Sequence, residues 1–345
     1  MHLSFTDPSN HTFLRGVFSA AAMAGVVLCE ATDLYNILNQ GARVSSLAES
    51  NYLLLIGKPS KPSPSDVEVE QELCGATGCV CVFPDARTKQ EYDESHVLMA
   101  KRSKRDANGD FVIPACVEVE SMRYCVVYDG HAGSVEDCGP AAECAAVLEQ
   151  CSRNPVQILR GGYEDFSACY PFLRTQKILY SPQELEELRP HPVEILPGRL
   201  YMGDRTQASD QQVLKDLKIK ALVDVSGEPS SALIGSGCEV LASPPADSVE
   251  EDLSGFFQEA CRFTDVQLGA GASVLLFSCR GVSHCSAMAM AFLIHHLRCT
   301  LQEAWAHMLK CKNNMRPNRG FVQQLSAWER AVLGEERTDI SEPSF

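Results

Sequence analysis

Apolar residues in the C-terminal third of the chain fall into two kinds of run, one of strand length and one of helical length. Val274–Phe277 is a short continuous apolar run, which is typical of a buried strand. Ala287–Ile294 is rich in alanine, methionine and leucine and predicts a helix. A compact turn of small and polar residues with one glycine, Gly281, joins them. This arrangement predicts an anion site, because the turn amides converge and the helix N-terminus adds partial positive charge.

The same patterning predicts elements throughout the chain. Ala31–Asn39 places its apolar residues on one helical face, and Leu301–Lys310 is amphipathic. Tyr124–Tyr128 and Val156–Leu159 are apolar runs that predict buried strands. Strands that alternate with helices in this way predict an α/β fold class.

The length of 345 residues suits two ordinary domains, and a hydrophobic content of 45% indicates that most of the chain folds. A proline- and serine-rich stretch interrupts the first domain, and we expect it to be a flexible insertion. The expected segments are a flexible extension over 1–22, a first domain over 23–178 with the insertion at 57–81, a linker at 179–192, a second domain over 193–335 and a tail at 336–345.

Charge and cysteine content narrow the class of protein. The net charge of −15 argues against broad binding of nucleic acid or anionic membranes. The 16 cysteines show no repeated metal-type spacing, so we expect reduced thiols and no metal or other cofactor. No apolar run reaches the ~18 residues that a membrane span needs. We expect a cytoplasmic protein, while the apolar stretch Phe18–Cys29 leaves a mitochondrial or secretory signal open as the alternative.

The turn after Phe277 resembles the phosphate-binding loop of the protein tyrosine phosphatase superfamily, in which His-Cys is followed by two residues, glycine, two residues and arginine. Aligned through Gly281, the nucleophilic cysteine falls at Ser278 and the arginine at His284. The resemblance implies a pseudophosphatase, which keeps the amide cradle, has no catalytic residue and carries degenerate positions at Ser278 and His284. The expected phosphate-loop residues are Ser278, Cys279, Arg280, Gly281, Val282, Ser283 and His284.

The surrounding segments resemble a dual-specificity protein tyrosine phosphatase-like domain. Ile195–Gly203 is similar to the opening of that domain, and Pro317–Phe321 is similar to its closing turn. The family keeps a general-acid aspartate in a loop between them, and the resemblance makes Asp247 the candidate for a vestigial acid. The acids near Asp247 fit the first turn of a helix equally well, so both interpretations stay open.

The first domain resembles the rhodanese/Cdc25-like fold. The motif is a strand followed by Asp85-x-Arg87, then Glu-Tyr and His-Val pairs, and later a strand that ends in Leu-x-Gly-Gly. The resemblance implies that Asp85 and Arg87 are structural. It also places Asp129 where active members carry a cysteine. A carboxylate cannot accept sulfur and repels phosphate, so we expect a degenerate, inert loop over Asp129–Val135.

Four basic residues, Lys101, Arg102, Lys104 and Arg105, form a cluster in this acidic chain. Such a charge run is usually a solvated surface loop. MAP-kinase phosphatases carry a basic cluster in a non-catalytic rhodanese domain, where it docks onto an acidic groove of the kinase. The resemblance therefore implies a kinase docking site, which would act by electrostatic steering.

The two-domain architecture and the string Phe-Ser-x-x-Gly-x-Ser resemble the MK-STYX-like (serine/threonine/tyrosine-interacting-like) pseudophosphatases. That type keeps an arginine where this chain has His284. The resemblance implies an inactive protein that regulates phospho-signalling by binding phosphoproteins, MAP kinases or other phosphatases. The alternative is a weakly active protein phosphatase with Cys279 as a shifted nucleophile. This shift would put Val282 in the glycine position, where a valine suits the turn poorly.

Overall fold

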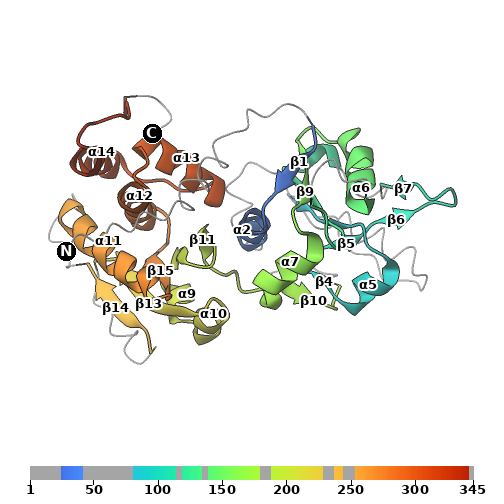
Figure 1. Cartoon of the computed structure of the whole chain (residues 1–345), viewed down its shortest axis with the longest axis horizontal. Coiled ribbons are helices and arrows are strands. Elements are labelled where there is room, and N and C mark those ends of the chain that lie inside the picture. The colour runs from blue at the N-terminus through green and yellow to red at the C-terminus, as the bar shows by residue number, and fades with distance from the viewer. Residues whose placement is uncertain are drawn as a thin grey trace, which may run out of the picture. The chain divides into compact units, whose positions relative to one another are not determined.

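The computed structural model describes residues 25–41, 81–113, 119–133, 139–178, 188–227, 237–243 and 253–341. The chain divides into two compact units, one over Ala22–Pro190 and the other containing His191–Phe345 (Figure 1). The expected extension over 1–22 and most of the expected insertion and linker lie outside the described residues. Cys81, the last residue of that insertion, already belongs to a strand.

The N-terminal unit is built on a four-stranded parallel sheet. Both faces of its central strands are buried, as is usual for parallel sheets, which explains their continuous apolar runs. The predicted strands at Tyr124 and Val156 are thereby confirmed. In spatial order the strands are β1 (Val27–Cys29), β9 (Val156–Leu159), β8 (Tyr124–Val127) and β2 (Cys81–Val82).

Helices and short strand pairs complete this unit. The predicted helix at Ala31 is confirmed as α2, and a small core lies between one face of the sheet and α6. The helices are α2 (Ala31–Gly41), α5 (Lys89–Glu94), α6 (Pro140–Glu149) and α7 (Gly162–Cys169). The strand pairs are β3 (Pro84–Asp85) with β5 (Lys101–Arg102), β6 (Lys104–Arg105) with β7 (Phe111–Val112), and β4 (His96–Val97) with β10 (Arg174–Thr175).

The C-terminal unit contains a five-stranded sheet in which only β11 runs antiparallel to its neighbour. The predicted strand before the turn is confirmed as its central strand, β15, and all six residues of β15 are buried. In spatial order the strands are β11 (Val193–Leu196), β12 (Leu200–Asp204), β15 (Ser273–Ser278), β13 (Ile219–Asp224) and β14 (Glu239–Ala242).

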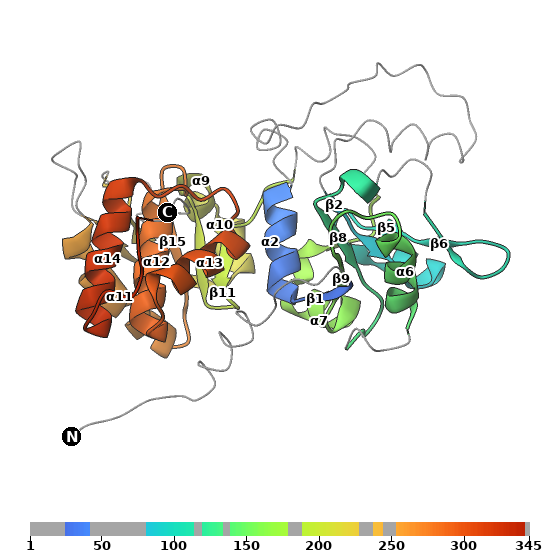
Figure 2. The ribbon, with the colours of Figure 1, turned by 90° about the horizontal axis from the view of Figure 1, so that it is seen from above.

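Helix α12 forms the centre of this unit, because it packs against β15 and three other helices, α11, α13 and α14 (Figure 2). Its residues from Cys285 to Ile294 are all buried, as expected for a helix that is apolar on every side. None of the described helices has the length and apolarity that crossing a membrane requires. The helices are α9 (Arg205–Ser209), α10 (Gln211–Asp216), α11 (Ser254–Gly269), α12 (His284–Leu297), α13 (Leu301–Cys311) and α14 (Arg319–Leu333).

The segment 336–341, which the sequence places in a tail, packs onto this unit instead. The buried carboxylate of Glu329 accepts hydrogen bonds from Thr338 Oγ1 at 2.8 Å and from the Arg337 amide at 3.0 Å. It also accepts one from the Leu301 amide at the start of α13. Because a buried carboxylate needs such donors, the packed part of the unit extends beyond residue 335.

Candidate functional site

The predicted strand–turn–helix lies between β15, which ends at Ser278, and α12, which begins at His284. Gly281 lies in the turn with a φ of 63°. A Cβ atom added there would lie 2.6 Å from the carbonyl oxygen of Gly203 on β12. Only glycine tolerates both this backbone conformation and this close approach, so the turn is held against β12.

Ser278 lies at the base of this loop with 5% of its surface exposed. The amide N–H of Gly281 donates a hydrogen bond to Ser278 Oγ over 3.1 Å. The hydroxyl also lies close enough to the thiol of Cys285 to lower the pKa of that thiol. The Ser278 hydroxyl is therefore bound by a backbone donor and lies beside a thiol.

Cys285 is a site neighbour that the sequence pattern did not identify. Burial raises the pKa of the Cys285 thiol to about 12, although the hydrogen bond with Ser278 acts in the opposite direction. At neutral pH this thiol is protonated. Its Sγ lies 3.7 Å from the carbonyl oxygen of Gly203, in the same close approach of loop and β12. A helical pattern could have placed Cys285 in the core but not beside Ser278.

The other side chains of the loop are more exposed to solvent than Ser278 and Cys285 at its base. Cys279 and Arg280 are exposed, whereas Ser278 is buried, so the two neighbouring residues 278 and 279 face different environments. His284 is half-buried, and its ring centroid lies 4.9 Å from that of Phe321, with the planes at 66°. The imidazole of His284, which the sequence alignment expects at the arginine position, therefore packs edge-on against an aromatic ring.

The expected vestigial acid, Asp247, lies outside the described residues. Two other aspartates near the loop have structural hydrogen bonds. Asp204 caps α9 by accepting from the Gln207 amide at 3.0 Å, and Asp224 accepts from the Ser226 amide at 2.9 Å. Both carboxylates already satisfy backbone donors.

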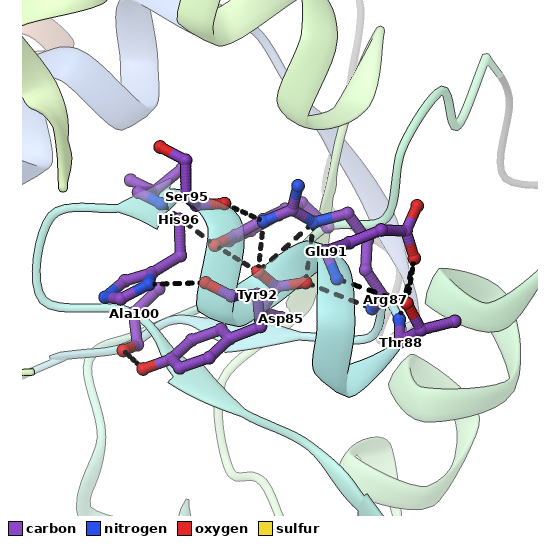
Figure 3. A network of polar contacts seen from close by, with 10 residues as sticks. Asp85, Arg87, Thr88, Glu91, Tyr92, Ser95, His96 and Ala100 are labelled. Carbon is purple, nitrogen blue, oxygen red and sulfur yellow. Dashed lines mark hydrogen bonds and ion pairs between the residues drawn. The ribbon is translucent and has the colours of Figure 1, made fainter. Parts of the chain in front are cut away.

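In the N-terminal unit, Asp85 and Arg87, which the sequence analysis expects to be structural, form a buried ion pair (Figure 3). Arg87 Nη2 lies 2.6 Å from Asp85 Oδ2 and also donates to the carbonyl oxygen of Ser95 over 2.8 Å. The hydroxyl of Tyr128 donates to the same carboxylate over 2.9 Å. These bonds tie the end of β3 to β4 and β8, which confirms a structural role for the pair.

Asp129, which the sequence analysis places at a degenerate loop position, lies two residues beyond the end of β8. Its Oδ1 accepts hydrogen bonds from the amides of His131 at 3.1 Å and Ala132 at 2.8 Å. Its Oδ2 accepts from the amide of Ala141 in α6 at 3.2 Å. The carboxylate is thus surrounded by backbone donors from two segments.

The basic cluster lies on β5 and β6. Lys101, Lys104 and Arg105 are all exposed. Arg105 also packs its guanidinium 3.8 Å from the centroid of Phe111 and forms an ion pair with Glu143 at 2.8 Å. An open cavity of about 720 Å³ is lined by Arg102, by Arg105 and by the loop after Asp129. The fold therefore brings Arg102 and Arg105 of the basic cluster close to the loop after Asp129, which the sequence alone did not predict.

Comparison with known proteins agrees with the C-terminal fold. Residues 200–331 match the family described as "Dual specificity phosphatase, catalytic domain". Dual specificity protein phosphatase 4 of Homo sapiens is 27% identical over 297 residues, covering 74% of this chain and 75% of that protein. Dual specificity protein phosphatase 5 of Rattus norvegicus is 33% identical over 220 residues and 57% of each chain.

Among solved structures, the human tyrosine phosphatase-like serine/threonine/tyrosine-interacting protein aligns with 42% of this chain and 99% of its own, at 27% identity and a TM-score of 0.38. The family match begins at β12 and ends within α14, so it includes β15, the Gly281 turn and α12. The C-terminal unit therefore contains a domain similar to the dual-specificity phosphatase catalytic domain, and the comparisons support a dual-specificity phosphatase-like protein.

Proposed function

We propose that this chain is a catalytically inactive, MK-STYX-like member of the dual-specificity phosphatase-like proteins that regulates phospho-signalling by binding phosphoproteins, MAP kinases or other phosphatases. The observation that carries the proposal is the position of Ser278 at the base of the loop, where its hydroxyl accepts the Gly281 amide hydrogen bond. The family motif has its nucleophilic cysteine at this position.

A serine here lacks the means of activation that a cysteine has. Loop amides and a helix N-terminus lower a cysteine pKa from ~8.5 far enough to give a thiolate at neutral pH. A hydroxyl starts much higher and needs an adjacent general base. The side-chain neighbour of Ser278 is the thiol of Cys285, and its pKa of about 12 makes it unsuitable as a base at neutral pH.

The second support is His284. Arginine grips two phosphate oxygens with a planar, permanently charged fork, and a neutral imidazole offers a single N–H donor. The His284 ring also packs against Phe321. By analogy with the loss of one oxyanion-hole donor, we expect this change to cost transition-state stabilisation of about 3 kcal/mol or more.

For the N-terminal unit we propose a rhodanese-like docking module for kinases. Its support is the parallel sheet, the Asp85–Arg87 ion pair at the motif position and the exposed lysines of the basic cluster. The alignment with dual specificity protein phosphatase 4 covers 74% of the chain, far more than residues 200–331, so it also includes part of this unit. A basic patch on an acidic protein favours a partner with an acidic groove.

Capture of purified MAP kinases by the full chain tests the docking role. The double variant Lys101→Glu with Lys104→Glu should weaken capture, and wild-type capture should weaken as salt rises. A matched control, Lys215→Glu with Lys220→Glu, makes the same change of charge at exposed lysines of the other unit. If the amount of kinase captured changes neither with salt nor in the Lys101→Glu/Lys104→Glu variant, docking does not occur through this cluster.

A titration with phosphopeptides tests the binding role of the loop itself. Chemical shifts of the Gly281 and Ser283 amides should respond if the cradle still holds phosphate, because these amides belong to the turn. If they stay constant while kinase capture persists, the protein acts as a scaffold and the phosphoprotein part of the proposal is wrong.

The exposure of Cys279 favours one second candidate, a weakly active phosphatase with this residue as a shifted nucleophile. Its thiol is accessible and lies one residue beyond the strand end. The geometry of the turn opposes this candidate. The Gly281 amide donates its hydrogen bond to Ser278 Oγ, so the turn serves a nucleophile at position 278 and not at position 279. Turnover of an aryl phosphate decides between the two candidates.

A further inference from the structure

A short peptide segment lies against two helices of the C-terminal unit. It consists of residues 335–341, which we name the C-terminal strap, and it follows Gly334, where α14 ends in a left-handed turn. The strap lies beyond residue 331, where the family match ends. Within the strap Thr338 is buried, and Ile340 packs partly buried against the core of the unit. Two side chains, two residues apart, therefore attach the strap to a domain that the family match covers without it.

Two helices form the site that holds Thr338. The carboxylate of Glu329 on α14 is fully buried and accepts a hydrogen bond from the Leu301 amide over 2.8 Å, so α13 fixes its position. The same carboxylate accepts hydrogen bonds from the Thr338 hydroxyl over 2.8 Å and from the Thr338 amide over 3.2 Å. The next amide of α13, that of Gln302, donates to the Thr338 hydroxyl over 3.2 Å. The hydroxyl is thus donor and acceptor at once, and a side chain without it would leave the buried carboxylate short of a donor.

The part of the strap ahead of Thr338 is held at the surface. Glu336 forms an ion pair with Arg330 of α14, and Glu335 forms one with Arg337 within the strap. All four of these side chains are exposed, and exposed ion pairs contribute little to stability. Opening of the strap therefore costs mainly the hydrogen bonds to the buried carboxylate and the contact of the apolar side chain, which makes it a local event.

We propose that the Glu329 carboxylate and the start of α13 form a recognition site for short acidic peptide segments of partner proteins, and that the C-terminal strap occupies this site in the isolated chain. The segment that fits has a threonine for the carboxylate and an apolar β-branched residue two positions later, as Thr338 and Ile340 are in the strap. An acidic residue two positions ahead of the threonine matches Glu336, which pairs with Arg330. A partner segment binds only when the strap opens, so the strap is an internal competitor with a local concentration on the order of millimolar.

The test opens the strap in the full-length chain and supplies the strap sequence as a separate peptide. Thr338→Glu brings a second carboxylate against that of Glu329, so the strap leaves while the residues of the site stay unchanged. The matched control is Ser341→Glu, which makes the same change at an exposed serine of the strap. The probe is the synthetic peptide Glu-Glu-Arg-Thr-Asp-Ile-Ser, the sequence of residues 335–341, together with an analogue that has valine in place of threonine.

We expect the peptide to bind Thr338→Glu at least about tenfold more tightly than it binds wild type or Ser341→Glu, in which the strap competes. Chemical shifts of the Leu301 and Gln302 amides should follow the titration, because these amides belong to the site. The valine analogue should bind at least about tenfold more weakly than the peptide, since it leaves the buried carboxylate without one of its donors. The thermal midpoint of the variant should rise with added peptide, by linkage of binding to folding.

A second variant keeps the proposal testable if Thr338→Glu fails to fold. Ile340→Asp loosens the strap at its apolar contact and leaves Thr338 and Glu329 as they are. The strap then competes less well, so this variant should also bind the peptide more tightly than wild type does, and the valine analogue should again bind more weakly.

Three results would overturn the proposal. If neither variant binds the peptide more tightly than wild type, the strap is only a packed part of the fold. If the valine analogue binds as well as the peptide, the Glu329 carboxylate does not select threonine. If wild type forms a concentration-dependent dimer that Thr338→Glu abolishes, the site takes the strap of a second copy and not a segment of another protein. None of these measurements involves kinase capture or phosphate, so this inference and the proposed function fail or succeed separately.

Discussion

The Ser278 hydroxyl and the Cys285 thiol are neighbours at the base of the turn between β15 and α12, close enough for the hydroxyl to act on the pKa of the thiol. In the proposed alignment through Gly281, Ser278 stands at the position of the motif's cysteine, and Cys285 follows the position of its arginine. Burial in the structure raises the pKa of the Cys285 thiol to about 12.

Putting the motif's cysteine and arginine back at positions 278 and 284 should restore phosphatase activity, and each substitution should add to the rate. Ser278→Cys alone should give little turnover of an aryl phosphate, and adding His284→Arg should raise it by a factor of about 10² or more. Because the new thiol would lie against that of Cys285, the triple variant with Cys285→Ser should be faster still and less sensitive to oxidants. Initial rates with and without reductant check this. If the triple variant gains nothing, the amide cradle lacks the shape of an active loop.

Gly281 should be irreplaceable for the stability of the C-terminal unit. Gly281→Ala combines a φ of 63° with a Cβ only 2.6 Å from a backbone oxygen, and we expect a loss of about 2 kcal/mol or more in the free energy of unfolding. The matched control is Gly271→Ala, with a φ of 77° and nothing within 4 Å of the added Cβ, which should cost about 1 kcal/mol. Denaturant unfolding measures both variants. Equal losses would show that the close approach to β12 is absent in solution.

Asp265 should make this unit sensitive to acid. Burial alone would raise its pKa, but hydrogen bonds with His295 at 3.0 Å and His296 at 2.7 Å outweigh burial and hold the pKa well below its usual value. A lowered folded-state pKa contributes stability above the unfolded value of about 3.9, and this stability is lost as pH falls further toward the folded value. The difference in thermal midpoint between wild type and Asp265→Asn should therefore shrink below about pH 4. A difference that stays constant from pH 7 to pH 3 would contradict the assignment.

Local sequence patterns predicted most of the elements near the site but few of its contacts. The apolar run before Phe277 gave β15, and the single glycine of the turn marked the residue with a positive φ, because both signals are local. A structural role for Asp85 and Arg87 was also predicted, from the motif that contains them, but their ion pair was not. The donor from Ala141 to Asp129 is not local, because it depends on how α6 packs beside β8.

The contact between Ser278 and Cys285 was missed for a related reason. A helical pattern places Cys285 in the core, yet its neighbour is fixed by the Gly281 turn, which brings the start of α12 back over the end of β15. The cavity between the basic cluster and the degenerate loop likewise depends on strands more than twenty residues apart in the chain. Sequence motifs identified each part without showing that the parts meet.

The most direct measurement for the proposed loss of catalysis is turnover of a small aryl phosphate by the purified full-length chain, with Cys279→Ser alongside. Within the described residues no base is in place beside Ser278, and position 284 carries no guanidinium group, so we predict no turnover above buffer for wild type and no change in the variant. Measurable turnover that Cys279→Ser abolishes would contradict the account and establish the shifted-nucleophile phosphatase in its place.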